Sequence, residues 1–218
     1  MIRGAADGKP AEREEFARRY GPLVRAYLVA RWRGGVLGGE IEDAVQEVFL
    51  ECFRDGGVLD HVDPSCARGF RAFLFGVVRN VAMRVESRRQ RKREIQPSTS
   101  FVGDLEGAEE TPSHVFDRLW AYTLMRQTAE KHAARAREVG EAAVQRVELL
   151  RLRFEEGLEI HQIAERWGLE PWRVQKDYAR ARAEFREVLL EVVSFHHPGT
   201  PGEIARECEN LKLLLRGI

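Results

Sequence analysis

The sequence has little of several features that mark particular protein classes. Its 218 residues include only three cysteines, Cys52, Cys66 and Cys208, and no C-x-x-C pair. An odd number of widely spaced cysteines argues against a disulfide framework and against a structural zinc site. No run approaches the roughly 20 apolar residues needed to cross a bilayer, and residues 1–10 lack the apolar core of a signal peptide. We therefore expect a soluble, cytoplasmic protein with no membrane insertion.

The motifs of familiar enzymes are also missing. The chain has no G-x-x-x-x-G-K-[ST] phosphate loop, no G-x-S-x-G nucleophile elbow and no H-E-x-x-H metal helix. His61 has no second potential metal ligand at a usable spacing. These absences predict a protein that is not an enzyme and that requires no cofactor and no metal.

The net charge does not indicate the class of binding partner, because the chain has 35 basic and 35 acidic residues. The charges are nevertheless segregated. Residues 79–93 contain seven Arg and Lys residues and one acid, Glu86, whereas residues 104–117 contain five acids and no Lys or Arg. A helix that buries one side and gathers cations at its far end is suited to a polyanion, although charge runs are often only solvated surfaces.

Helical periodicity dominates the chain, and no segment reads convincingly as an alternating strand. Apolar stripes predict helices at about 12–32 with a disturbance at Gly21 and Pro22, from Ile41, from Phe70, and at 116–139, 142–156, 160–167 and 171–195. Pro171 suits a first helical turn, because its missing N–H would have no intrahelical partner there.

The composition of residues 95–115, rich in Pro, Gly, Ser, Thr and acids, is typical of a flexible linker. We therefore predict an all-α fold of two small helical domains, residues 10–94 and 116–195, with this linker between them. Residues 196–218 form a C-terminal extension with a helical stripe of Ile204, Cys208, Leu211 and Leu215. The extension is either a regulatory helix or a helix that completes the second core.

Residues 158–186 have the pattern of a helix-turn-helix. Gly168 can take the left-handed conformation of the turn, and the small Ala164 lets a second helix approach. Ile163 and Ala164 lie on the inner side of the first helix, and Val174 lies on the buried side of the second. The second helix would bury one side and present six polar residues, which we call the outer face: Arg173, Gln175, Lys176, Asp177, Arg180 and Arg182. Such side chains can read the major groove of DNA, with Asp177 accepting from a cytosine or orienting Arg173 or Arg180. The alternative is an ordinary amphipathic hairpin with a salt-bridged surface.

Three segments together resemble regions 2 and 4 of the extracytoplasmic-function (ECF) branch of bacterial sigma-70 family RNA polymerase sigma factors. In chain order they are IEDAVQEVFLECF, FRAFLFGVVRNVAMRVESRRQRKR and LLRLRFEEGLEIHQIAERWGLEPWRVQKDYARARAEFREVL. The resemblance implies a region 2 helical bundle in the first domain and a region 4 helix-turn-helix in the second. It implies a DNA-binding sigma factor that binds core RNA polymerase and directs promoter recognition and transcription initiation. An anti-sigma factor is a further partner that it allows.

The resemblance also implies roles for individual residues. Five would bind core polymerase: Asp43, Gln46, Glu47, Leu50 and Arg54. Six would bind the minus-10 promoter element: Phe75, Arg79, Asn80, Arg84, Arg88 and Arg89. Among these Phe75 would contact an unstacked base, whereas Phe70 and Phe73 are expected in the core. Asp60, His61 and Asp63 are weaker candidates for capturing a flipped base, and the outer face would bind the minus-35 element.

The chain departs from the family's pattern at the helix-turn-helix. Glu159 stands where Ser or Thr usually caps the first helix, with Gln162 at the capping-box position. Trp172 replaces a usually small residue and Asp177 a commonly basic one, which predicts an unusual minus-35 preference. Two other functions remain open: a helix-turn-helix transcription regulator that acts without loading onto core polymerase, and a helical protein–protein adaptor.

Overall fold

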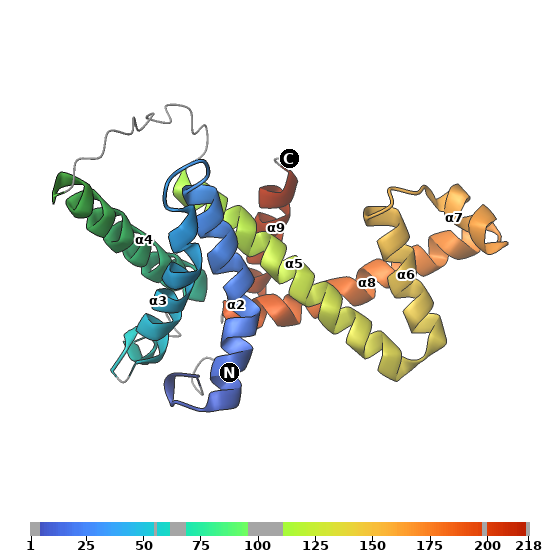
Figure 1. The fold of residues 1–218 in the computed structure, drawn as a ribbon. Helices are drawn as coiled ribbons and strands as arrows, with labels where there is room; N and C mark the ends of the chain where they lie inside the picture. Colours follow the sequence, from blue (N-terminus) through green and yellow to red (C-terminus); the bar gives the residue numbers. More distant parts are fainter. Residues whose placement is uncertain (1–4, 55, 62–68, 96–110, 198–199, 217–218) are drawn as a thin grey trace. The chain divides into compact units, whose positions relative to one another are not determined.

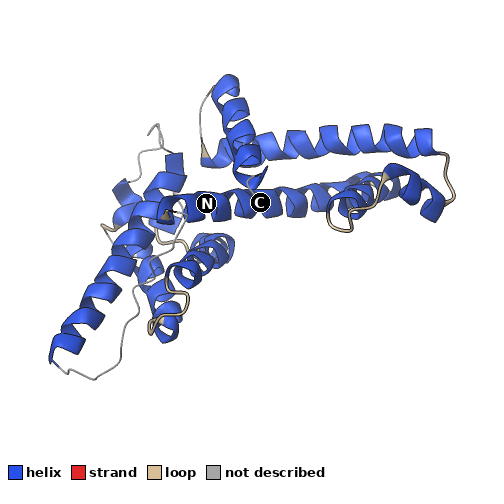
Figure 2. Cartoon of the chain, turned by 90° about the horizontal axis from the view of Figure 1, so that it is seen from above, coloured by secondary structure: helices blue, strands red, loops and turns tan. Residues whose placement is uncertain are grey.

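The computed structural model describes residues 5–54, 56–61, 69–95, 111–197 and 200–216, without the side chains of 60, 61, 69, 93–95, 215 and 216. Throughout these ranges the regular elements are helices (Figure 2), which confirms the predicted all-α fold. They divide into two compact units, one within residues 1–123 and 214–218 and the other within 124–213. None of the helices in the described ranges combines the length and apolar character needed to span a membrane.

Unit 1 contains α2 (Pro10–Arg31), α3 (Ile41–Phe53), α4 (Gly69–Ile95) and the first turns of α5 (Pro112–Val139) (Figure 1). Short 3-10 turns at Gly38–Glu40 and Val58–His61 flank α3, and α3 packs against both α2 and α4. The predicted disturbance at Pro22 does not end α2. Pro22 lies on the exposed side of the helix, and the residues that follow it, Leu23 and Val24, are buried and hold the helix in place.

Aromatic side chains fill the core of unit 1. The ring of Phe16 meets that of Phe70 edge to face at 5.9 Å, and Tyr20 stacks parallel to Trp120 at 6.1 Å. Phe116 is fully buried and contacts Tyr27 at 5.6 Å. The first turns of α5 therefore belong to the core of unit 1, and the division between the units falls inside α5, after the Phe116 at which the sequence placed the second domain.

The start of α5 also differs from the predicted linker over 95–115. Residues 96–110 lie outside the described residues, but residues 112–115 are helical. The Thr111 hydroxyl accepts a hydrogen bond from the backbone N–H of His114 at 3.4 Å, and Pro112 follows directly. A capping threonine and a proline in the first turn begin a helix before its apolar periodicity is visible.

Unit 2 contains the rest of α5, α6 (Glu141–Phe154), α7 (Ile160–Trp167), α8 (Pro171–His196) and most of α9 (Pro201–Arg216). α6 and α7 each pack against α8. The buried Nε2 of His196 lies 3.2 Å from Oε1 of Gln127 and joins α8 to α5. In α9, Cys208 and Leu211 are buried, as expected for the apolar stripe of this helix.

Candidate nucleic-acid interface

The helix-turn-helix predicted in residues 158–186 is present in unit 2. Glu159 and Gln162 form a capping box at the start of α7, in which the Glu159 N–H donates to Oε1 of Gln162 at 2.8 Å. Gly168 ends α7 with φ 63° and ψ 34°, the left-handed conformation that glycine adopts without steric cost. The Leu169 N–H then donates to the carbonyl of Ala164 at 2.9 Å. The capping box satisfies the helix start despite the unusual glutamate.

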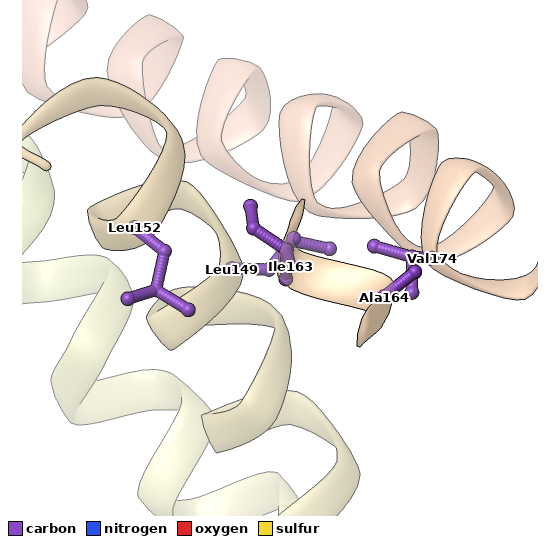
Figure 3. Packing of buried hydrophobic residues seen from close by; sticks show 5 residues of the cluster. All are labelled: Leu149, Leu152, Ile163, Ala164 and Val174. Atoms are coloured by element: carbon purple, nitrogen blue, oxygen red, sulfur yellow. The ribbon is translucent and has the colours of Figure 1, made fainter. Parts of the chain in front are cut away.

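A small apolar core sets the angle between the two helices. Figure 3 shows its five buried residues, which come from α6, α7 and α8: Leu149, Leu152, Ile163, Ala164 and Val174. Trp167, Leu169 and Tyr178 pack against them and are partly buried. This is the packing that the sequence predicts for Ile163, Ala164 and Val174. It leaves the opposite side of α8 to solvent.

Five of the six residues of the outer face are exposed: Arg173, Gln175, Lys176, Arg180 and Arg182. Two of these arginines are held against aromatic rings. The guanidinium of Arg173 lies 5.3 Å from the ring centroid of Trp172, and that of Arg182 lies 5.6 Å from that of Tyr178. A cation over a ring has fewer accessible rotamers, so both guanidinium groups are partly pre-positioned for an anionic partner.

Asp177 stands apart from the other residues of the outer face. It is half-buried. Hydrogen bonding to Glu184 raises the pKa of Arg146 of α6, and the charge of Asp177 adds to that rise. Arg180, which sequence reasoning offered as a partner of Asp177, instead donates from Nε to Oε1 of Glu184 at 3.1 Å. Asp177 is therefore within electrostatic range of α6, and the minus-35 role that the resemblance implies for it stays a prediction.

An open groove of about 520 Å³ lies at the starts of α7 and α8. Its polar lining includes Arg153, His161 and Gln175, and the exposed ring of Trp172 forms one side. Nδ1 of His161 lies 3.2 Å from a carboxylate oxygen of Glu159. Sequence reasoning did not single out Arg153 or His161, because their place beside the outer face arises only when α6 and α7 pack against α8.

In unit 1, the cationic end of α4 is open to solvent. Its exposed polar residues include Arg79, Asn80, Arg84, Arg88, Arg89, Arg91 and Lys92. The single acid of this stretch, Glu86, accepts hydrogen bonds from Arg31 at 2.7 and 3.0 Å and from the indole of Trp32 at 2.8 Å. Glu86 therefore links α4 to the end of α2. Its charge is balanced by Arg31 and not by the exposed cations of α4.

Phe75, the candidate for contact with an unstacked base, packs against aromatic rings of two other helices. Its ring lies 5.1 Å from that of Phe116 and 5.9 Å from that of Tyr27, and the residue is half-buried. Phe70 is buried, as predicted, and Phe73 packs beside it at 5.7 Å. Because α5 supplies Phe116, the α4 stripe alone did not reveal that Phe75 is covered.

On α3, the residues predicted to bind polymerase do not form one uniform surface. Asp43, Gln46, Leu50 and Arg54 are exposed, with Leu50 at 69%. Glu47 is half-buried and paired with two arginines of α4. Its Oε2 lies 2.6 Å from Nη2 of Arg88, and its Oε1 lies 3.3 Å from Nη2 of Arg84. Sequence reasoning thus assigned Glu47, Arg84 and Arg88 to two different partners, whereas the structure pairs them with one another.

Glu51 of α3 completes this cluster, and sequence reasoning missed it. Its Oε1 lies 2.9 Å from Nη1 of Arg84. The available signal was the matched spacing of Glu47 and Glu51 on one helix and Arg84 and Arg88 on another. We call these four residues the α3–α4 ion-pair cluster.

The remaining candidates are not placed. Asp63 lies outside the described residues, as do the side chains of Asp60 and His61. In the portion of the chain that the structure describes, His, Cys, Asp and Glu side chains form no group of three suited to a metal ion. No protein-family model and no curated protein matches the chain.

Proposed function

We propose that this protein is a sigma factor that binds core RNA polymerase and directs it to promoters. The observation that carries the proposal is the exposed cationic face of α8. This helix follows a left-handed turn at Gly168, and its opposite side packs against α6 and α7 in a shared buried core. This is the arrangement by which a second helix enters the major groove. The α8 outer face would bind the minus-35 element.

The second support is the solvent-exposed end of α4 in unit 1. Arg79, Asn80 and Arg89 are exposed and would meet the minus-10 element, with phosphates bound by the cations that follow. Exposed Leu50 amid the polar residues Asp43 and Gln46 suits a protein contact, which we assign to core polymerase. Unit 1 would thus contact both polymerase and DNA.

Transcription in vitro tests the proposal. Core RNA polymerase, the purified full chain and a library of promoter fragments are combined, and run-off transcripts are sequenced. We expect transcripts that require the chain and that start downstream of a shared pair of sequence elements. Core polymerase that makes no chain-dependent transcript from any fragment would contradict the proposed function.

The complete helix-turn-helix in unit 2 is equally compatible with a transcription regulator that never loads onto core polymerase. Co-purification separates the two functions: a sigma factor should associate with core polymerase at low salt, and a conventional regulator should not. A helical adaptor without nucleic-acid contact is a third possibility. Steeply salt-dependent promoter binding by the reconstituted complex would exclude that adaptor.

A further inference from the structure

The α3–α4 ion-pair cluster occupies cations that a nucleic acid would use. Arg88 donates to both carboxylate oxygens of Glu47, at 2.6 and 3.4 Å. Arg84 bridges Glu47 at 3.3 Å and Glu51 at 2.9 Å. The contact with Glu47 raises the pKa of Arg88 above its ordinary value, so the guanidinium remains a cation whose charge is already balanced.

The two acids are the less accessible side of the cluster. Their side chains are 25% and 19% exposed, whereas those of Arg84 and Arg88 are 47% and 57% exposed. Each arginine side chain is therefore accessible to solvent, but its guanidinium N–H groups point toward the acids of α3. Ion pairs at this exposure are weak enough to be exchanged for a competing anion or cation.

We propose that Glu47 and Glu51 mask Arg84 and Arg88 from nucleic acid in the free chain, and that a cationic partner surface docking on α3 unmasks them. This inference rests on the proposed function, in which Glu47 faces core polymerase and the two arginines face DNA. A partner that supplies cations to Glu47 replaces Arg88 in the ion pair and leaves the Arg88 guanidinium available to DNA. Linkage makes the effect reciprocal: DNA that binds the arginines leaves Glu47 ready for the partner.

The cluster divides the cations of α4 into two groups. Arg79, Arg89, Arg91 and Lys92 are exposed along the same helix, and the cluster does not include them. They give the free chain a basal affinity for any polyanion. Arg84 and Arg88 add to that affinity only after the cluster opens. The free chain should therefore bind DNA with a smaller salt dependence than its exposed cations alone suggest.

Titration of the full-length free chain with a fluorescently labelled DNA duplex of random sequence, at several salt concentrations, tests the masking. Glu47→Gln should raise affinity and steepen the salt dependence by about 0.9 in log–log slope for each phosphate newly bound. Glu42→Gln is the matched control, because it removes the same charge from the same helix. Glu42 pairs with Arg25 of α2 at 2.7 Å, away from the cluster. Equal effects of the two substitutions would overturn the masking.

A double-mutant cycle locates the effect in the cluster. Arg88→Gln should weaken DNA binding less in the wild-type chain than in the Glu47→Gln chain, where it should cancel most of the gain. An equal loss in both backgrounds would show that Arg88 is already available to DNA and would overturn the proposal. Circular dichroism of each variant confirms that it is folded.

Reconstituted holoenzyme tests the unmasking. Arg88→Gln should weaken promoter binding of the holoenzyme several-fold more than it weakens binding of the free chain. The same small effect in both states would overturn the unmasking. Failure of the proposed function has a different signature: the wild-type chain would support no transcription by core polymerase, whatever the free-chain titrations show.

Discussion

Arg146 of α6 and Glu184 of α8 form an ion pair with two hydrogen bonds in unit 2. Nε of Arg146 donates to Oε2 at 2.9 Å, and Nη2 donates to Oε1 at 2.7 Å. The arginine side chain is only 7% exposed, and its Nη1 also donates to the Ala142 carbonyl at 3.0 Å. Because α8 carries the outer face, this pair fixes the position of the outer face relative to α6.

Glu184→Gln should destabilise unit 2 by about 2 kcal/mol, because it removes the carboxylate that accepts two hydrogen bonds from the nearly buried Arg146. This is less than the roughly 3–5 kcal/mol for a fully buried pair, since Glu184 is partly open to water. Glu187→Gln, an exposed site one turn along the same helix, should change stability by less than about 0.5 kcal/mol. Urea denaturation followed by circular dichroism measures both. Similar losses for both variants would contradict the special role of the pair.

Acid should destabilise unit 2 in two stages. Burial lowers the pKa of His132, so the unfolded chain binds more protons than the folded one, and stability falls as the pH drops below about 6.5. The pairing with Arg146 lowers the pKa of Glu184, so further stability is lost below about pH 4.3. Above both values these contributions are fully present.

Urea midpoints measured as a function of pH separate the two groups. His132→Gln should flatten the first stage. Glu184→Gln should reduce the second without abolishing it, because Glu191 and Glu148 also have lowered pKa values. It should also enlarge the first stage, because the Glu184 carboxylate, 3.9 Å from Nε2 of His132, raises the pKa of that imidazole. Glu187→Gln serves as the control for the second stage. An unchanged slope between about pH 6.5 and 5 in His132→Gln would show that His132 does not carry the first stage.

Two glycine substitutions should have opposite signs. Gly168→Ala forces a side chain into a left-handed conformation and should cost about 1 kcal/mol. Gly76→Ala lies inside α4, where an added Cβ meets nothing within 4 Å, and should stabilise by about 0.5–1 kcal/mol. Thermal unfolding of the two variants and the wild type measures the difference. A stabilising Gly168→Ala would contradict the turn geometry.

Substitutions on α8 should alter promoter choice. Arg173→Ala and Lys176→Ala each remove an exposed cation from the outer face and should weaken or shift minus-35 usage by about 1–3 kcal/mol if the side chain reads a base. Arg186→Ala removes an exposed cation from the same helix, at the last residue of the helix-turn-helix and outside the outer face, and is the control. The measurement is run-off transcription from the promoter library. Identical promoter rankings for all three variants would contradict the prediction that α8 recognises the minus-35 element.

Local patterns were sufficient for much of the fold. The stripe from Phe70 predicted the buried side of α4, and the stripe of Ile163, Ala164 and Val174 predicted the core of the helix-turn-helix. Gly168 was predicted in the left-handed turn where the structure has it. These predictions concern residues within a few turns of one another, and helical periodicity and turn chemistry act over that range.

Contacts between distant segments were not predictable in this way. The apolar stripe of α4 did not show that α5 brings Phe116 against Phe75. The pattern of α8 did not show that α6 brings Arg146 close enough for the charge of Asp177 to act on it. In each case the deciding neighbour lies on another helix, and helical period alone does not say which helices meet or in what register.

By itself the sequence determined which residues form helices, which sides of those helices are apolar and where the cations are concentrated, because these depend on spacing along the chain. Tertiary structure alone decided which charges are already paired. Glu47 lies next to Arg88, and Glu184 next to Arg146, only after helices far apart in the sequence pack together. Ion pairing depends on distances of a few ångströms between side chains, and the register between packed helices sets those distances.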